Sequence, residues 1–296
     1  MKPAPLEYLV AETREEALAA LERYDGNARL LAGGQSLVPL LNMRLVRPTA
    51  VIDINRIPGL NAIAADDGVV RIGALARYSA LESSATVRDR LPLLARAIPF
   101  IGDRQIRNRG TLGGALCHAD PAGEMALCAV TMGATLRIAG HGAQRELSAA
   151  ELFQGPYTTA LEATEMLVEA VFPAAPGTVA TVAEHARRHG DFAVVSVAAA
   201  GLPGEGEIWR WIRIGLGAVA DRPLYARRAS ERLAGTRLEP DAIREAARLC
   251  LEDAEPASDI RASAEYRRHL IPIYVERVLV ELRQRRAGAD PGEAHR

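Results

Sequence analysis

The sequence predicts an α+β fold, and three observations on the order of its segments lead to this class. The first part of the chain alternates candidate helices with candidate strands, the last third contains three candidate strands in succession, and helical patterns follow them. Strands followed by helices are typical of a sheet that is backed by helices. The chain has 296 residues, 49% of them hydrophobic and 25% charged, which is an average composition for a globular protein.

The first 57 residues predict a small βαβ-like unit. Thr13 and Glu16 have the spacing of a capping box, so we expect a helix that begins after Thr13. Asp-Gly-Asn at residues 25–27 ends this helix. The remaining elements of the unit are a buried strand, a helix and a second strand, expected at residues 29–32, 37–44 and 50–54.

Residues 58–176 predict a second unit. Its expected strands are residues 69–72, 135–138 and 165–172, and its expected helices are residues 78–83 and 121–132. A glycine-containing turn is expected at residues 110–114. Pro173, Pro176 and Gly177 predict a linker after the last strand.

Residues 177–286 predict an α+β domain with an antiparallel sheet. Its expected strands are residues 181–188, 194–200 and 209–219. Two or three helices follow, and the last is expected to begin near Ile271, with Val275, Val278 and Leu282 on one face. We expect residues 287–296 to be a flexible tail.

Charge, hydropathy and cysteine content exclude several classes of protein. Lys and Arg number 36 against 37 Asp and Glu, and this balance lacks the basic surplus that binding to nucleic acid requires. The longest apolar run, residues 192–202, is about half of the ~20 residues that span a bilayer. The N-terminus resembles no secretory signal, which favours the cytoplasm. Three scattered cysteines form no disulfide framework or CxxC metal motif.

Two glycine pairs are candidate binding elements for a phosphate-containing ligand. The first lies in AGGQS at residues 32–36, and the second lies in GTLGG at residues 110–114. Glycine lets the backbone approach a ligand closely, and successive N–H groups can bind an anion such as a pyrophosphate. Glu124 follows the second pair and could accept a hydrogen bond from a ribose hydroxyl. Either pair could instead be an ordinary tight turn, and neither has the Rossmann or P-loop pattern.

Three ordered stretches of the sequence carry a resemblance to a known family. They are RLLAGGQSLVPLLNMRLVRPTAVIDI, IGDRQIRNRGTLGGALCHADPAGEMALCAV and RIGLGAVADRP. Together they resemble the FAD-binding medium subunit of molybdenum hydroxylases, the family of the carbon monoxide dehydrogenase medium subunit and the xanthine dehydrogenase FAD domain. The resemblance extends from Leu6 to about Arg285. It implies a PCMH-type (vanillyl-alcohol-oxidase-like) FAD-binding fold of two α/β subdomains and a C-terminal domain.

The resemblance also implies which residues contact FAD. The two glycine segments would bind the pyrophosphate from opposite sides through backbone amides, and Glu124 would hold the ribose. Ile101, which replaces an aromatic residue of the xanthine dehydrogenase branch, and Leu167 would line the ring system, and Phe192 would approach it from the third domain. Ala115 stands where many relatives have Asn. The full expected set is Ala32, Gly33, Gly34, Gln35, Ser36, Ile101, Thr111, Gly113, Gly114, Ala115, Glu124, Leu167 and Phe192.

Other interpretations of these side chains stay open at this level. Ile101, Leu167 and Phe192 could be ordinary core residues. Cys117 and Cys128 are interpreted as small buried hydrophobic residues, and His118 with Asp120 as turn residues or neighbours of the cofactor. The three arginines at positions 104, 107 and 109 could form a solvated face, or could meet a partner subunit or the phosphates.

The resemblance implies a redox function in which no side chain acts as an acid or a base. FAD in this chain would pass electrons from two [2Fe-2S] clusters of a small subunit to a terminal acceptor, and a large subunit would carry the molybdopterin cofactor. The assembly implied is a dimer of heterotrimers. One alternative is a free-standing FAD-dependent oxidase or dehydrogenase, and another is a nucleotide-binding or scaffolding protein without turnover.

Overall fold

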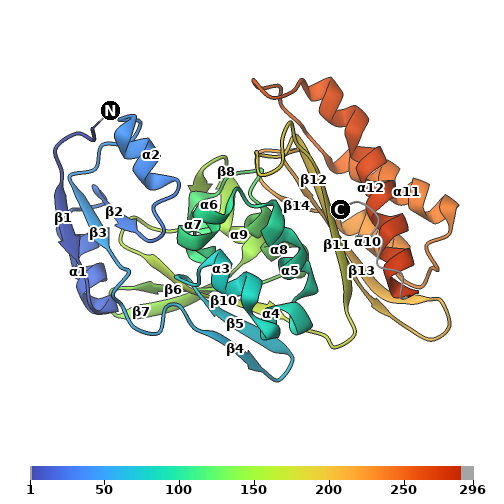
Figure 1. The fold of residues 1–296 in the computed structure, drawn as a ribbon, viewed down its shortest axis with the longest axis horizontal. Helices are drawn as coiled ribbons and strands as arrows, with labels where there is room; N and C mark the ends of the chain where they lie inside the picture. The colour runs from blue at the N-terminus through green and yellow to red at the C-terminus, as the bar shows by residue number, and fades with distance from the viewer. Residues whose placement is uncertain (1, 288–296) are drawn as a thin grey trace.

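The computed structural model describes residues 2–287, and the main sheets of this part of the chain lie in a row (Figure 1). The sheets contain three, five and four strands in chain order. Of the predicted tail at residues 287–296, only Ala287 lies within the described residues.

The N-terminal sheet is parallel, with strand order β1-β3-β2. Its elements are β1 (Glu7–Val10), α1 (Arg14–Arg23), β2 (Ala28–Leu31), α2 (Leu37–Asn42) and β3 (Ala50–Asp53). The predicted capping box is present, because Thr13 and Glu16 each accept a backbone hydrogen bond from the other's segment. The predicted βαβ unit is confirmed, because β2 and β3 are parallel and α2 connects them. The strand β1 is an additional strand on the other side of β3.

The five-stranded sheet of the middle part is antiparallel, with strand order β4-β5-β10-β6-β7. Its strands are β4 (Ile63–Asp66), β5 (Val69–Gly73), β6 (Thr135–Gly140), β7 (Ala143–Ser148) and β10 (Met166–Pro173), and β8 (Phe153–Gly155) pairs with β9 (Thr158–Thr159) nearby. The helices are α3 (Tyr78–Ser83), α4 (Ala85–Arg90), α5 (Pro92–Ala97), the 3₁₀ helix η1 (Ile98–Phe100), α6 (Arg104–Arg109), α7 (Leu112–His118), α8 (Glu124–Met132) and α9 (Ala149–Leu152).

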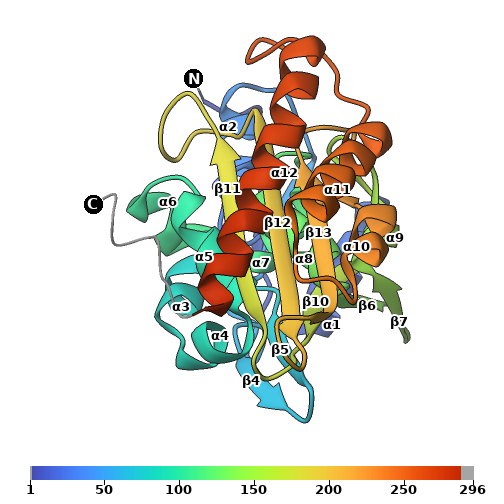
Figure 2. The ribbon, with the colours of Figure 1, turned by 90° about the vertical axis from the view of Figure 1, so that its right-hand side faces the viewer.

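The C-terminal sheet is also antiparallel, with strand order β11-β12-β13-β14. Its elements are β11 (Val179–His185), β12 (Val195–Pro203), β13 (Trp209–Gly217), β14 (Leu224–Tyr225), α10 (Arg227–Leu233), α11 (Pro240–Asp253) and α12 (Ala264–Arg286). Figure 2 shows the last three helices against one face of this sheet, and α5 and α8 of the middle part contact strands of the same sheet. The sheet is therefore buried between two layers of helices.

Two helices begin at residues other than those predicted. The helix α8 begins at Glu124 and not at residue 121, because Asp120 holds residues 121–123 in a turn through its carbonyl and its carboxylate. The last helix begins at Ala264, well before Ile271, and Ser263 caps it by accepting a hydrogen bond from the Tyr266 N–H. The first turns of this helix are mostly polar, so the spacing of apolar residues did not predict where it begins.

The core falls into three hydrophobic clusters within the described residues. The largest joins the middle part to the C-terminal sheet and contains Leu94, Leu116 and Phe172. A second lies under α11 and α12 around Trp209, and a third joins the N-terminal sheet to the five-stranded sheet. Because apolar packing joins each of the three main sheets to its neighbour, the loops at the junctions of these sheets are held in fixed positions.

Candidate functional site

The first glycine segment connects β2 to α2 and presents unused hydrogen-bond donors. Gly34 has a φ of +74°, a left-handed conformation that glycine adopts without the steric cost other residues incur. Within the described chain, the backbone N–H groups of residues 33–36 donate to no protein acceptor. Ser36 precedes α2 and makes no side-chain capping bond. Successive free N–H groups beside a free hydroxyl form a concavity that suits an anion.

The second glycine segment is the start of a helix, which corrects the prediction of a turn at residues 110–114. Thr111 caps α7, and its hydroxyl accepts a hydrogen bond from the Gly114 N–H at 3.1 Å. The Leu112 N–H donates to the Ala76 carbonyl at 3.0 Å, and the Gly113 N–H donates to the Ala74 carbonyl at 2.8 Å. These three amides are therefore engaged within the protein, so the expectation that Gly113 and Gly114 offer N–H groups to a phosphate is corrected.

The two glycine segments lie against each other. A Cβ atom on Gly33 would lie 2.3 Å from the Arg109 carbonyl oxygen, and a Cβ atom on Gly114 would lie 4.0 Å from the Cβ of Ala32. Glycine at position 33 therefore permits close packing of residues 32–34 on residues 109–110. Gly113 packs equally closely on Ala74, where an added Cβ would lie 2.5 Å from the Ala74 Cβ. The free amides of residues 33–36 thus lie beside the first turn of α7.

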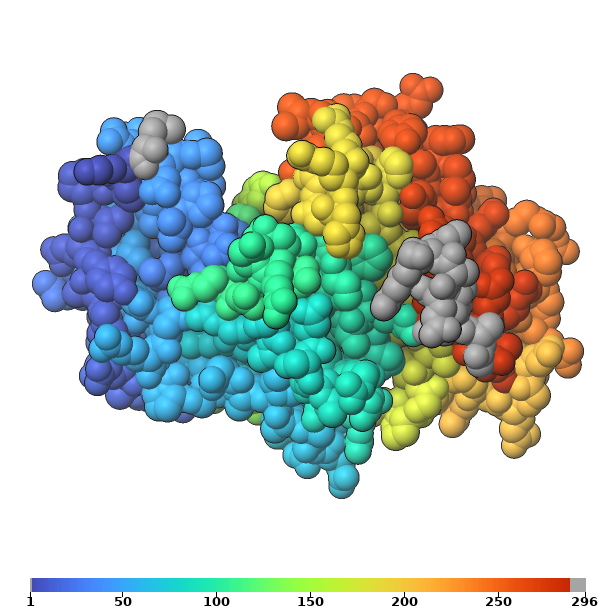
Figure 3. Space-filling model, viewed as in Figure 1, coloured from blue at the N-terminus to red at the C-terminus, as the bar shows by residue number. Residues whose placement is uncertain are grey.

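One face of α7 continues this surface and carries Cys117 and His118. Cys117 is an exposed residue, which contradicts its interpretation as a buried one, whereas Cys128 is fully buried as expected. Desolvation nevertheless raises the pKa of Cys117 to about 12, partly opposed by the backbone of Leu167. Figure 3 shows a notch between the N-terminal part and the yellow C-terminal segment.

The apolar candidates divide into two groups. Ile101 and Leu167 are buried, with 8% and 4% of their surface exposed, as core residues would be. Phe192 is 44% exposed, so it is not a core residue, and the Arg261 guanidinium lies 4.9 Å from the centre of its ring. A Cβ on Gly190 would lie 2.8 Å from the Gly102 carbonyl oxygen, so the loop that carries Phe192 packs beside Ile101.

Tyr157 is a neighbour of this surface that the sequence analysis missed. Its ring centre lies 5.1 Å from that of His118, and its hydroxyl donates a hydrogen bond to Asp120 at 3.3 Å. Desolvation raises the pKa of Tyr157, the Asp120 carboxylate raises it further, and Arg261 opposes the shift. His118 and Asp120 therefore act as neighbours of Tyr157 rather than as a catalytic pair. Tyr157 lies in a short loop without periodicity, and only tertiary structure brings it to α7.

Glu124 begins α8 and faces a second acidic side chain, Glu184 of β11. Burial raises the pKa of both carboxyl groups; the charge of Asp120 raises that of Glu124 further, and the charge of Glu124 raises that of Glu184 further. One oxygen of Glu184 is buried without a hydrogen-bond partner. Burial and the nearby charge of Glu124 therefore both favour the protonated form of Glu184. The carboxyl group of Glu124 thus interacts electrostatically with Glu184 of the C-terminal sheet. The expected contact of Glu124 with a ribose did not include this interaction.

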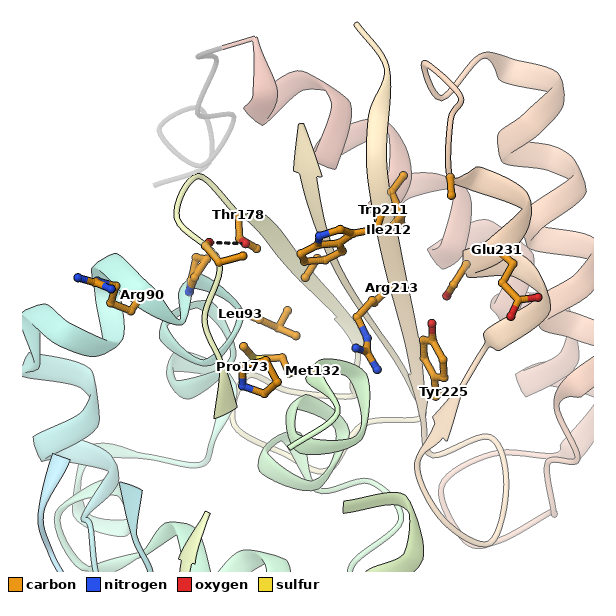
Figure 4. A pocket seen from close by; sticks show the side chains of 15 residues that line it. Arg90, Leu93, Met132, Pro173, Thr178, Trp211, Ile212, Arg213, Tyr225 and Glu231 are labelled. Atoms are coloured by element: carbon orange, nitrogen blue, oxygen red, sulfur yellow. Dashed lines mark hydrogen bonds between the residues drawn. The ribbon is translucent and has the colours of Figure 1, made fainter. Parts of the chain in front are cut away.

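A separate cavity lies between the middle part and the C-terminal sheet, and Figure 4 shows its lining. It has a volume of about 430 Å³, and none of the predicted site residues lines it. Leu93, Met132 and Trp211 contribute apolar walls, and the Arg213 guanidinium lies 4.8 Å from the centre of the Tyr225 ring. The glycine segments and this cavity are distinct features of the molecule.

Residues 2–287 contain no group of three or more His, Cys, Asp or Glu side chains that could hold a metal ion. None of the helices there combines the length and apolar character needed to cross a bilayer.

Comparison with known proteins gives matches along nearly the whole chain. Residues 4–175 match the FAD binding domain in molybdopterin dehydrogenase, and residues 180–282 match the CO dehydrogenase flavoprotein C-terminal domain. The glyceraldehyde dehydrogenase medium chain of Sulfolobus acidocaldarius is 35% identical, over 95% of this chain and 100% of that protein. The carbon monoxide dehydrogenase medium chain of Hydrogenophaga pseudoflava is 36% identical, over 94% of this chain and 97% of its own length.

Solved structures agree with the sequence matches. Carbon monoxide dehydrogenase from Hydrogenophaga pseudoflava contains a chain with a TM-score of 0.93 and 36% identity, which covers 97% of this chain and 99% of its own. Quinoline 2-oxidoreductase from Pseudomonas putida gives a TM-score of 0.91 at 36% identity, with coverage of 97% and 99%. These findings confirm the predicted α+β class and the PCMH-type fold. The chain belongs to the family of FAD-binding medium subunits of molybdenum hydroxylases.

Proposed function

We propose that this chain binds FAD and passes electrons through it, as one subunit of a heteromeric molybdenum hydroxylase. The observation that carries the proposal is the row of free backbone N–H groups at residues 33–36, held beside Gly114 in a chain of this family. A diphosphate carries negative charge and accepts hydrogen bonds, so it satisfies donors that the protein leaves free. The residues present therefore fit the anionic bridge of FAD.

The two glycine segments would contact the FAD diphosphate in different ways. Gly33, Gly34, Gln35 and Ser36 would donate backbone hydrogen bonds to the diphosphate, and the Ser36 hydroxyl would add one more. Gly114 would provide a surface without a side chain against which the diphosphate lies. Ala32, Thr111, Gly113 and Ala115 would shape the cradle from behind.

The apolar candidates would contact the ring system of FAD. Ile101 and Leu167 are buried, and the exposed ring of Phe192, in the loop between β11 and β12, would cover the ring system from the C-terminal part. FAD, when bound, supplies the two-electron redox chemistry, and the protein binds and orients it. Glu124 stays a candidate for the ribose, and its coupling to Glu184 would make that contact sensitive to pH.

We further propose the partners and the organisation of the assembly. Relatives described as medium chains and as subunits of dehydrogenase complexes support partner chains for this one. The partners would be a large subunit with the molybdopterin cofactor and a small subunit with two [2Fe-2S] clusters, arranged as a dimer of heterotrimers. Three free cysteines are consistent with the cytoplasm, where thiols stay reduced. The domain limits proposed are 1–57, 58–176 and 177–286, with a tail at 287–296.

Visible spectroscopy tests this function. The chain is purified alone and with its co-expressed genomic neighbours, and each preparation is examined for flavin, iron and molybdenum. We expect flavin absorbance in the isolated chain without substrate oxidation, and oxidation only in a complex that contains all three cofactors. Turnover by the isolated chain with FAD would favour the free-standing oxidase instead. A chain that takes up no FAD would refute both flavin functions.

A further inference from the structure

Two side chains outside the glycine segments connect them. Asn55 follows β3, and its amide N–H group donates to the Ala32 carbonyl at 2.9 Å and to the Leu31 carbonyl at 3.2 Å. The same amide contacts an Asp53 carboxylate oxygen at 2.7 Å, which fixes its orientation. Asn55 therefore holds the backbone that leads directly into Gly33.

Arg77 extends this connection to the second glycine segment. One of its guanidinium nitrogens donates to the Asn55 side-chain oxygen, and another donates to the Arg109 carbonyl. The backbone beside Arg77 pairs with the same segment, because the Tyr78 N–H donates to the Gly110 carbonyl at 3.1 Å. One continuous path of hydrogen bonds thus runs from Ala32 through Asn55 and Arg77 to Arg109.

The charge of Arg77 is not neutralised by a direct ion pair. Across the described residues, no carboxylate forms a salt bridge with Arg77, and its guanidinium donates to neutral oxygens. Burial and the neighbouring charge of Arg109 lower the pKa of Arg77, and the more distant Asp53 opposes this shift. The Arg77 guanidinium therefore lies beside Gly33, because the Arg109 carbonyl oxygen that it binds is the atom nearest to an added Cβ on Gly33. An anion bound there would lower the electrostatic energy of this charge.

We propose that Asn55 and Arg77 form a clamp that sets the spacing of the two glycine segments and makes the cradle positive toward a diphosphate. Both are positioning residues, because they act through the backbone at Ala32 and Arg109. The clamp rests on the proposed FAD function and deepens it. It makes the cradle a preformed one, which reduces the ordering that binding requires.

Titration of the full-length chain with FAD tests the clamp. FAD is removed and added back, and the dissociation constant is measured from flavin fluorescence at low and moderate salt. Asn55→Asp keeps the size of the side chain and an acceptor for Arg77, but it has no donor for the Ala32 carbonyl. We expect it to weaken binding by roughly tenfold. Asn61→Asp is the matched control, because Asn61 is exposed and makes no side-chain hydrogen bond in the described residues.

Arg77 variants separate geometry from charge. Arg77→Lys keeps the positive charge but cannot span both acceptors, so we expect weaker binding with an unchanged salt dependence. Arg77→Met removes the charge, so we expect weaker binding with a reduced salt dependence, a change that a purely structural defect would not produce. Arg90→Met is the control on an exposed arginine without an ion pair among the described residues.

The outcomes distinguish failure of the clamp from failure of the function. If the wild-type chain binds no FAD, the proposed function is wrong. If the wild-type chain binds FAD and Asn55→Asp binds it as tightly as Asn61→Asp does, the clamp is wrong. Should Asn55→Asp not fold, Arg77→Lys and Arg77→Met decide, and equal affinity and salt dependence in both and in wild type would overturn the proposal.

Discussion

Replacing Gly33 with alanine tests the close packing of the two glycine segments. The added Cβ would lie 2.3 Å from the Arg109 carbonyl oxygen and 3.0 Å from the Gly110 Cα. Ordinary van der Waals contact begins at 3.4 Å, so the two backbone segments must separate by about 1 Å. Inserting one methyl group into a packed site costs about 1–3 kcal/mol.

This cost predicts a measurable loss of FAD affinity. If the variant relieves the overlap by opening the cradle, FAD binding must close it again and restore the strain. A penalty of about 1–3 kcal/mol then corresponds to binding that is roughly 5-fold to 150-fold weaker. Fluorescence titration of FAD measures this change, and thermal unfolding of the unloaded chain shows whether the fold survives.

Gly155→Ala provides the control for Gly33→Ala. A Cβ on Gly155 would meet no atom within 4 Å, and its φ is not in the left-handed region. We expect this variant to bind FAD as tightly as the wild-type chain. If Gly33→Ala and Gly155→Ala have the same dissociation constant, the two segments do not need their close contact to bind FAD, and the reasoning is refuted.

Three further predictions concern side chains around the site and in the core. Glu184 has a raised pKa in the folded chain, so its contribution to the free energy of unfolding is fully present below pH 4.5 and is lost as the pH rises. Glu184→Gln should therefore reduce the fall of melting temperature with rising pH, and an unchanged slope would contradict this. Cys117 should be the thiol that reacts in the native chain. Its reaction should be slow, because a pKa of about 12 leaves roughly three orders of magnitude less thiolate than an ordinary thiol has. FAD should block its reaction with iodoacetamide, and equal labelling with and without FAD would place Cys117 outside the site. Arg267 is buried and donates to two carbonyls and to Asp259, so Arg267→Ala should lower the free energy of unfolding by about 3–5 kcal/mol, whereas Arg268→Ala, on the exposed side of the helix, should change it little in urea denaturation.

The sequence predicted those helices and strands that local signals, such as capping residues, turn residues and apolar runs, are sufficient to define. The capping box of Thr13 and Glu16 placed the first helix, and the strands expected at residues 194–200 and 209–219 correspond to β12 and β13. Six strands were missed, β1, β4, β7, β8, β9 and β14; each has six residues or fewer, and β1, β4 and β7 are largely exposed. Their strand conformation comes from pairing with neighbouring strands, a cause that a local window does not contain.

The candidate site was predicted in outline and not in its chemistry. The glycine pairs pointed to residues 32–36 and 110–114, and the structure brings these segments into contact. The sequence could not show that the Gly113 N–H donates to the Ala74 carbonyl while the Gly33 N–H has no acceptor among residues 2–287, because backbone pairing depends on the tertiary partner. Asn55 and Arg77 lack any motif, and only their shared contacts distinguish them from surface residues.

A crystal structure of the chain loaded with FAD would show where the diphosphate binds. We expect the diphosphate oxygens to lie within hydrogen-bond distance of the backbone N–H groups of residues 33–36, with Gly114 on the opposite side. A structure that shows FAD fully bound, with its diphosphate elsewhere and these four N–H groups bonded to water, would contradict this expectation.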